Sequence, residues 1–317
     1  LARFGEAEVS LPGGCELGPR PIDLHLAALR ELGAEITERY GELRCKAKCL
    51  RGTDITLAIP SVGATENAIL AACGAEGTSV IYNAAREPEI VDLQALLRSM
   101  GARVNGAGGS IITVEGGAAL HGCTHRVIGD RIVCATYLCA AAAAGGEVRL
   151  TGVDYRAVST VALSLAESGC EVRSEADAVS LRSTGALRSV RPVRTAPYPG
   201  FPTDAQPVLM AALLRSEGCT VFVENIFENR YRHVDELSRM GAEIRVAGRV
   251  AVVNGVRTLH GAAVKCTDLR GGAALVIAGL SAEGTTRVTE LTHIDRGYDA
   301  IERDLAALGA QIRRETT

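Results

Sequence analysis

The segment LGAEI, Leu32–Ile36, decides the fold, because its pattern returns four more times along the chain. Each time, an apolar helix-like stretch ends at a glycine and a small residue, and a short strand-like stretch follows. The junction glycines are 68, 68, 72 and 68 residues apart, which indicates an internal repeat. The five junctions are LGAEI (Leu32–Ile36), MGARV (Met100–Val104), SGCEV (Ser168–Val172), MGAEI (Met240–Ile244) and LGAQI (Leu308–Ile312).

A second glycine motif lies between the junctions, in AEGTSV, AGGEVRL, SEGCTVFV and AEGTTRV, and marks another helix that ends at a strand. Each unit is therefore predicted to run strand, helix, strand, helix and strand pair. The stretches TERYGELRCKA, NGAGGSIITV and RVAGRVAVVNG fit the hairpins of such pairs. This alternation predicts the α/β class. The repeat leaves the packing open between a solenoid and symmetric globular domains, and the length of each unit favours the latter.

Composition narrows the functional classes. The chain has 317 residues, 47% hydrophobic and 22% charged, which is typical of a globular protein of about two domains. A net charge of −3 and an aromatic content of 3% argue against a nucleic-acid partner. The longest apolar runs, residues 132–144 and 273–280, are too short to cross a bilayer, so no membrane association is expected.

The ten cysteines include no CxxC pair and follow no secretory signal. Cys73, Cys134 and Cys139 lie in alanine-rich stretches, where cysteine usually acts as a small apolar residue. Reduced thiols and a cytoplasmic location are therefore expected.

Arginines stand where loops meet helices. Arg20 precedes the expected helix PIDLHLAALREL, Arg270 lies in CTDLRGGAALV, and Arg296 lies in LTHIDRGYDAIERDL, just before a helix. Any one of them taken alone, like Arg131 in IGDRIV, is better interpreted as a solvated arginine paired with a neighbouring aspartate. Three at equivalent joints are predicted to point at one centre and to bind an anion with several negative groups, with help from helix N-termini.

Asp204 lies in APYPGFPTDAQPVLMAALL, directly before an expected helix. It is either the N-cap of that helix or a general base presented at the helix start. The prolines at positions 197, 199 and 202 would hold it rigidly.

Two further stretches remain ambiguous. PSVGATENAILAA (Pro60–Ala72) either cradles a phosphate with backbone N–H groups or forms a capping turn around Thr65 or Asn67. NAAREPEIVDL (Asn83–Leu93) is best interpreted as a helix start with acidic residues in its first turn.

Cys15 follows Pro-Gly-Gly in SLPGGCELGPRPIDLH, five residues before Arg20. An exposed thiol near positive charge has a lowered pKa and is suited to reactive chemistry or proton transfer. The alternative is a small residue in a turn.

These stretches, together with ENIFENRYRHVDELSRMGAEI and HIDRGYDAIERDLAALGA, occur in an order that closely resembles the UDP-N-acetylglucosamine 1-carboxyvinyltransferase family of enolpyruvyl transferases. The resemblance covers essentially the whole chain. It implies two inside-out α/β barrel domains of repeated β-α-β-α-β-β units with the active site in the cleft between them. The implied domains are a partial barrel, 1–128, carrying the Cys15 lid loop, and a nearly complete barrel, 129–317.

The resemblance implies transfer of the enolpyruvyl group of phosphoenolpyruvate to the 3-hydroxyl of UDP-N-acetylglucosamine, with release of phosphate, as the first committed step of peptidoglycan synthesis. It implies no metal or organic cofactor. Asp204 is the implied base, and Cys15 the implied acid on a lid that closes over the substrate. The resemblance assigns phosphoenolpyruvate binding to Arg20, Arg270 and Arg296, and UDP-sugar binding to Pro21, Ile22, Asp23, Leu24, Ser61, Val62, Gly63, Asp204 and Ile226.

The chain departs from the family pattern at its start. It opens with LARFGEAEVSLP, after the place of a family Lys-Asn pair and a further arginine, and position 59 is isoleucine where some members have lysine. The expectation is therefore an N-terminally truncated, inactive fragment. The alternatives are a non-catalytic UDP-sugar-binding protein and an enolpyruvyl transferase with another acceptor.

Overall fold

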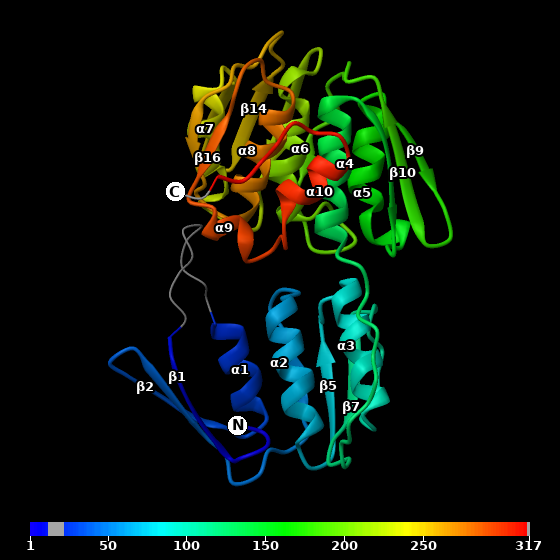
Figure 1. Cartoon of the computed structure of the whole chain (residues 1–317). Helices are drawn as coiled ribbons and strands as arrows, with labels where there is room; N and C mark the ends of the chain where they lie inside the picture. Colours follow the sequence, from blue (N-terminus) through cyan, green and yellow to red (C-terminus); the bar gives the residue numbers. More distant parts are fainter. Residues whose placement is uncertain (12–21, 316–317) are drawn as a thin grey trace. The chain divides into compact units, whose positions relative to one another are not determined.

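The computed structural model describes residues 1–11 and 22–315, and their contacts divide the chain into two compact units (Figure 1). Unit 1 comprises described residues 1–11, 22–128 and 197–199, and unit 2 comprises residues 129–196 and 200–315. Each unit has its own hydrophobic core.

The described part of unit 1 has two sheets with helices packed on them. An antiparallel sheet has the order β1-β3-β2, and a mixed sheet has the order β4-β5-β7-β6. The elements are β1 (Glu6–Ser10), α1 (Asp23–Glu31), β2 (Glu35–Arg39), β3 (Glu42–Lys46), β4 (Asp54–Thr56), α2 (Val62–Cys73), β5 (Thr78–Tyr82), α3 (Pro88–Ser99), β6 (Arg103–Asn105) and β7 (Ile111–Glu115).

Unit 2 is larger and has three sheets among its described residues, with the orders β8-β10-β9, β11-β12-β14-β13 and β15-β16. Its first half contains α4 (Arg131–Ala144), β8 (Gly146–Thr151), α5 (Tyr155–Glu167), β9 (Glu171–Ser174), β10 (Ala178–Ser183), β11 (Val193–Arg194), η1 (Thr203–Ala205), α6 (Gln206–Ala212), η2 (Leu213–Arg215) and β12 (Cys219–Val223). Its second half contains η3 (Arg230–His233), α7 (Val234–Arg239), β13 (Glu243–Ala247), β14 (Val250–Asn254), β15 (Ala263–Lys265), α8 (Leu269–Leu280), β16 (Arg287–Thr289), α9 (Thr292–Asp295) and α10 (Ile301–Ala307).

The predicted repeat is confirmed, because unit 1 and unit 2 each contain a four-stranded sheet of the same topology. In unit 1, β4 runs parallel to β5, and the β6–β7 hairpin pairs antiparallel with β5. In unit 2, β11, β12 and the β13–β14 hairpin have the same order and the same directions. The chain is α/β, as expected.

One prediction from the junctions is wrong. The fifth junction, Leu308–Ile312, ends α10 as expected, but no strand follows it within residues 309–315. A strand needs a hydrogen-bonded partner, and no described strand pairs with residues 309–315. At the other four junctions, the strand that follows the glycine pairs with the next strand in a hairpin.

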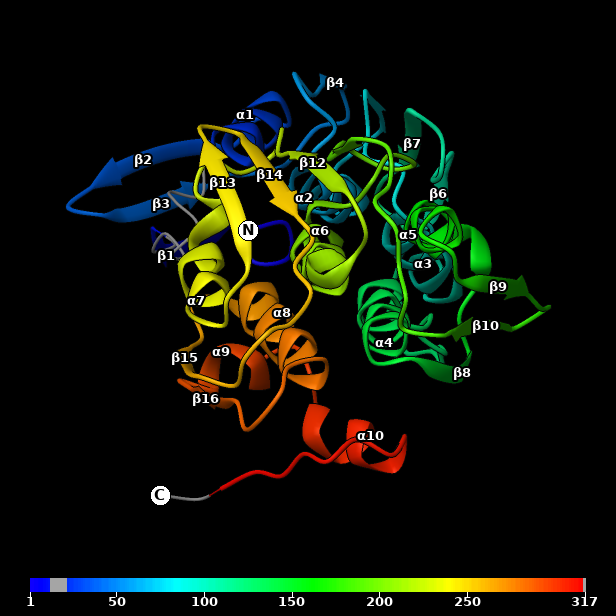
Figure 2. The same cartoon turned by 90° about the horizontal axis from the view of Figure 1, so that it is seen from above.

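Helices form the interior of unit 2. Viewed from above, α4, α6 and α8 lie together and the sheets lie around them (Figure 2). Every residue of α6 is buried, as are Arg270–Ala278 of α8 and most of α4. A helix that is apolar on all sides must be buried on all sides, which explains the alanine-rich and glycine-rich sequences of these helices.

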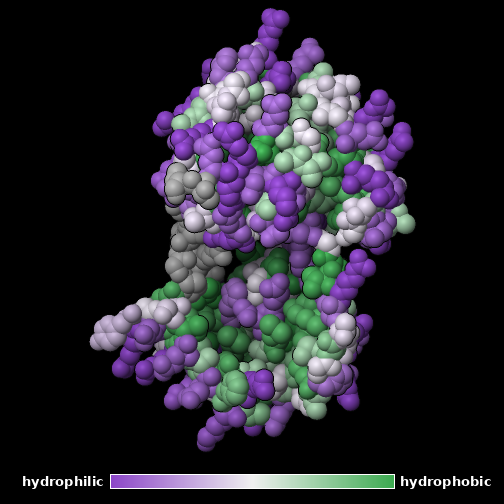
Figure 3. All heavy atoms as spheres, in the orientation of Figure 1, coloured by the Kyte–Doolittle hydropathy of each residue, from purple (hydrophilic) through white to green (hydrophobic). Residues whose placement is uncertain are grey.

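The corresponding helix of unit 1, α2, is less completely covered. Ile69 has no exposed surface, whereas the neighbouring Leu70 is 46% exposed. Figure 3 shows apolar side chains gathered over the part of unit 1 where α1 and α2 lie. One face of α2 therefore packs in the core of unit 1, and the opposite face is exposed.

The described cysteines are all free, and Cys73, Cys134 and Cys139 are buried as expected. No helix within residues 1–11 and 22–315 is both long and apolar enough to cross a membrane.

Because each unit has its own core, a cavity made in the core of unit 1 should destabilise unit 1 and leave unit 2 unchanged. Ile69→Ala should lower the free energy of unfolding of unit 1 by about 2–5 kcal/mol, because it removes a fully buried side chain. Leu70→Ala is the matched control on the same helix and should change stability by less than about 1 kcal/mol. Hydrogen exchange followed by mass spectrometry should show faster exchange in unit 1 alone. An equal loss of protection in unit 2 would contradict two independent cores.

Candidate active site

Asp204 lies between two arginine side chains in unit 2. Its Oδ1 is 3.0 Å from Nη2 of Arg230, and its Oδ2 is 3.3 Å from Nε of Arg270. Partial burial by itself would raise the pKa of Asp204, but the two guanidinium groups hold that pKa below its ordinary value. The carboxylate is therefore ionised at neutral pH and shared between two cations.

The N-cap alternative for Asp204 is not what the structure has. Asp204 lies in the 3₁₀ turn η1, the residue before α6 is Ala205, and no side chain caps that helix. The carboxylate is directed to the arginines instead.

Arg230 is the most deeply buried arginine among the described residues, with 1% of its surface exposed. It donates to Asp204 and, through both Nε and Nη2, to the backbone oxygen of Thr203 at 3.2 and 2.8 Å. The ring of Phe227 lies 5.7 Å from its guanidinium carbon. These contacts compensate for the burial of the guanidinium group, because an unpaired charge in the interior is strongly destabilising.

Glu224 positions the loop that carries Ile226. It is fully buried directly after β12, and its Oε1 accepts hydrogen bonds from the backbone N–H groups of Ile226 and Phe227 at 2.8 and 3.0 Å. Its Oε2 accepts from the hydroxyl of Thr203 at 3.0 Å. One carboxylate therefore fixes Ile226, which is 41% exposed, relative to the segment of Asp204.

Arg270 lies at the start of a helix, as predicted, whereas Arg296 lies at the end of one. Arg270 lies inside the first turn of α8, whose N-cap Asp268 accepts from the backbone N–H of Arg270 at 3.0 Å. Arg296 is exposed and follows α9 as its C-cap, and the helix that it was predicted to precede, α10, begins only at Ile301. Their neighbours pack closely, because an added Cβ at Gly297, next to Arg296, would come within 2.8 Å of Leu269, next to Arg270.

In unit 1, the predicted sugar-binding residues gather at two helix N-termini. Ile22, Asp23 and Leu24 open α1, and Ser61 caps α2, with its hydroxyl accepting from Ala64 N–H at 3.4 Å. The two ends lie side by side, because His25 of α1 is 2.6 Å from the side-chain amide of Asn67 of α2. Neighbouring N-termini offer unpaired N–H groups to an anion.

Gly63 packs closely on His25 at this contact. A Cβ at position 63 would come within 3.0 Å of the His25 ring. Burial lowers the pKa of His25, and the nearby carboxylate of Asp23 opposes that shift in part. Neither Thr65 nor Asn67 caps α2, since Ser61 does.

Three predicted residues, Cys15, Arg20 and Pro21, lie outside the described residues. The acidic stretch around Glu89 does open a helix, α3, with Pro88 in its first turn, as predicted. No group of His, Cys, Asp or Glu side chains that could hold a metal ion occurs within residues 1–11 and 22–315.

Sequence reasoning missed Arg230, Glu224, His25 and Tyr298, whose hydroxyl oxygen lies 3.0 Å from Nη1 of Arg270. Arg230 lies in ENRYRH beside a second arginine, Arg232, and nothing in the letters tells which of the two is buried. The burial of Glu224 depends on the pairing of β12 with β14 far along the chain. The place of His25 in the site follows only from its contact with Asn67, which is 42 residues away in the sequence.

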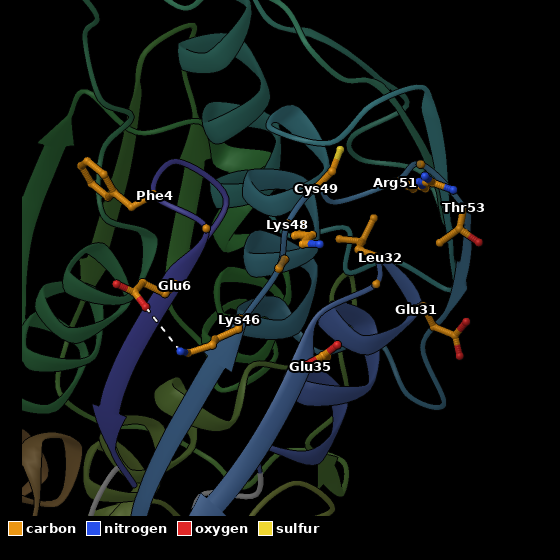
Figure 4. Close-up of a pocket in the computed structure, with 14 residues that line it drawn as sticks. Phe4, Glu6, Glu31, Leu32, Glu35, Lys46, Lys48, Cys49, Arg51 and Thr53 are labelled. Carbon is orange, nitrogen blue, oxygen red and sulfur yellow. Dashed lines mark ion pairs between the residues drawn. The ribbon is translucent and has the colours of Figure 1, made fainter.

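A concavity of about 1040 Å³ in unit 1 contains none of these residues (Figure 4). It lies at the C-terminal end of α1, around Gly33, with Lys46 paired to Glu6 at 3.8 Å. A similar concavity in unit 2 lies around the junction glycine Gly169. Because both lie at junction glycines of the repeat, they are features of its architecture and not of the candidate site.

Comparison with known proteins identifies the relatives of this chain. The family model for EPSP synthase (3-phosphoshikimate 1-carboxyvinyltransferase) matches residues 1–305. A UDP-N-acetylglucosamine 1-carboxyvinyltransferase of Gluconacetobacter diazotrophicus is 53% identical over 99% of this chain and 75% of its own length. One from Caldanaerobacter subterraneus is 50% identical over 99% of this chain and 75% of its own length.

Solved structures agree. The enolpyruvyl transferase NikO from Streptomyces tendae matches with a TM-score of 0.86 at 27% identity, over 98% of this chain and 74% of its own. EPSP synthase from Acinetobacter baumannii matches with a TM-score of 0.73 at 20% identity, over 98% and 75%, and so shares the fold.

The arginine pair makes a prediction for stability. Asp204→Asn removes the charge that Arg230 and Arg270 share and should lower the free energy of unfolding by about 2 kcal/mol, moderated by the partial exposure of Asp204. The control Asp299→Asn removes an exposed partner of Arg303 and should change it by less than about 1 kcal/mol.

The same prediction has a pH dependence. Because the pKa of Asp204 is lower folded than unfolded, its contribution is complete above the ordinary carboxyl pKa of about 4 and is lost as the pH falls through the folded value. Urea unfolding should therefore give a constant difference between the wild type and Asp204→Asn from about pH 5 to 8, and a smaller one below about pH 4. A difference that grows on acidification would refute the assignment.

Proposed function

The chain belongs to the EPSP synthase family of enolpyruvyl transferases, and on that premise we propose that it transfers the enolpyruvyl group of phosphoenolpyruvate to the 3-hydroxyl of UDP-N-acetylglucosamine and releases phosphate. The higher identity to the UDP-N-acetylglucosamine enzymes than to EPSP synthase supports this acceptor. The reaction supplies peptidoglycan synthesis. Free cysteines throughout the described residues are consistent with the reducing cytoplasm, where we place it.

The cluster of Asp204, Arg230 and Arg270 carries the proposal. The reaction forms a bond between the sugar oxygen and C2 of phosphoenolpyruvate and breaks the bond from C2 to the phosphate oxygen. It therefore needs a base for the hydroxyl and cations for a small, multiply charged anion. The cluster combines a carboxylate with two guanidinium groups within hydrogen-bond distance.

The geometry supports a coupling between anion binding and base strength. With both arginines paired to it, Asp204 is a weak base, because its pKa is lowered. An anion that takes over the contact of Arg270 weakens that pairing and raises the pKa of Asp204. Arrival of phosphoenolpyruvate would thus make Asp204 a better acceptor for the proton of the sugar hydroxyl.

The remaining roles rest on the family resemblance. Arg20 and Arg296 bind the phosphoenolpyruvate anion together with Arg270, and Cys15 delivers a proton to the methylene carbon so that C2 becomes electrophilic. After the sugar oxygen has added to C2, the phosphate leaves and the same carbon loses a proton, which restores the double bond. For the UDP-sugar, the proposed contacts are Pro21, Ile22, Asp23, Leu24, Ser61, Val62, Gly63, Asp204 and Ile226. The paired N-termini of α1 and α2 suit a diphosphate, and the exposed side chain of Ile226 suits an apolar face of the nucleotide sugar.

The test of the function is phosphate release from phosphoenolpyruvate with UDP-N-acetylglucosamine as acceptor. Asp204→Asn should lower the rate at least about 100-fold, because an amide cannot accept the hydroxyl proton. The control Asp299→Asn should keep the wild-type rate. Wild-type release that requires shikimate 3-phosphate in place of the UDP-sugar would replace the proposed acceptor. Wild-type rates in Asp204→Asn would remove its role as base.

The acid role has its own test. Cys15→Ala should lower phosphate release about 100-fold, while calorimetry should show that UDP-N-acetylglucosamine still binds. Cys49→Ala is the control, since Cys49 is an exposed thiol of unit 1 outside the site. An unchanged rate in Cys15→Ala would show that the proton comes from another group.

A further inference from the structure

The hydroxyl of Tyr298 accepts a hydrogen bond from the guanidinium group of Arg270. Tyr298 is 3% exposed, and its oxygen is 3.0 Å from Nη1 of Arg270. The same oxygen is 2.8 Å from the hydroxyl of Thr136, which is 1% exposed on the central helix α4. Three elements of unit 2 that are distant in sequence, α4, α8 and the segment after α9, meet at this point.

The donor and the acceptor of each hydrogen bond in this contact can be assigned. Thr136 donates its single hydroxyl proton to the backbone oxygen of Ile132 at 2.9 Å, so it accepts from Tyr298. Tyr298 then has only lone pairs for Arg270, which is always a donor. The bonds run from Arg270 to Tyr298, to Thr136 and to the carbonyl of Ile132, and every hydroxyl proton in the chain has a partner.

Arg270 is therefore held at both edges of its guanidinium plane. Nε bonds to Asp204 on one side and Nη1 bonds to Tyr298 on the other. The Tyr298 ring lies 5.4 Å from the guanidinium carbon, and the cap Asp268 fixes the backbone of Arg270. If an anion displaces the carboxylate of Asp204, the bond to Tyr298 remains and keeps the plane oriented.

The segment that supplies Tyr298 also supplies Arg296, two residues earlier. It packs tightly against α8, since a Cβ at Gly272 would come within 2.7 Å of Ile294 and one at Gly297 within 2.8 Å of Leu269. A shift of Tyr298 would therefore move Arg270 and Arg296 together.

We propose that Tyr298, supported by Thr136, is a positioning residue that orients Arg270 for the phosphoenolpyruvate anion and couples it to Arg296. This inference rests on the proposed function of the site. It predicts that removal of one buried hydroxyl group weakens the binding of one substrate and leaves the other unaffected.

The test uses Tyr298→Phe with Tyr137→Phe as the matched control. Tyr137 neighbours Thr136 on α4, is 8% exposed and donates its hydroxyl proton to Asp304 at 2.9 Å, so the control also deletes a hydrogen bond, here a partly buried one, between α4 and the C-terminal part of the chain. Tyr298→Phe should raise the KM for phosphoenolpyruvate about tenfold, with less than about threefold change in kcat and no change in the KM for UDP-N-acetylglucosamine. Tyr137→Phe should have wild-type kinetics.

Thr136→Val removes the acceptor of the Tyr298 proton and should raise the same KM by a smaller factor, about threefold. The double variant Tyr298→Phe, Thr136→Val should be no worse than Tyr298→Phe alone, because Thr136 acts only through Tyr298. Additive effects of the two substitutions would overturn this order of action.

The outcomes separate the inference from the function on which it rests. Wild-type protein that turns over, together with equal kinetics in Tyr298→Phe and Tyr137→Phe, would overturn the positioning role even if both variants lose thermal stability. Equal rises in the KM values of both substrates would overturn it as well. Wild-type protein that neither releases phosphate nor binds phosphoenolpyruvate in calorimetry would overturn the proposed function and the inference with it.

Discussion

Arg230 has 1% of its surface exposed, and its guanidinium group stays charged at any pH at which the protein folds. The surrounding chain must therefore bring a carboxylate and a carbonyl oxygen to it. Asp204 and the backbone of Thr203 meet this need, and Glu224 holds the hydroxyl of Thr203 in turn. The segment before α6 and the loop after β12 are thus fixed by one buried charge, and the proposed base and Ile226 are fixed along with it.

The same arrangement explains why the proposed base is also part of the structure. A carboxylate that stabilises two arginines has a low pKa and is poorly basic, whereas a catalytic base needs a pKa nearer the working pH. Substrate binding reconciles the two demands if the incoming anion replaces the carboxylate at Arg270. Under the proposed function, Asp204 would thus stay ionised until the proton of the acceptor has to be removed.

Local signals in the sequence were enough to predict the repeat. Junction glycines and hairpin turns depend on residues close together in the chain, and four of the five junctions lead to the expected strand. The fifth does not, since a strand also needs a partner that local sequence does not reveal. Arg230 and Tyr298 escaped prediction for the same reason, because their burial follows from contacts with residues 26 to 162 positions away.

The shared strand order of the two units points to descent from one ancestral motif by duplication. When β5 is superimposed on β12 along the chain, Gly63 stands opposite Asp204. At one such place the motif carries a glycine closely packed on His25, and at the other it carries the charged residue between two arginines. In this interpretation, divergence of one helix start gave a closely packed glycine in unit 1 and a charged residue between two arginines in unit 2.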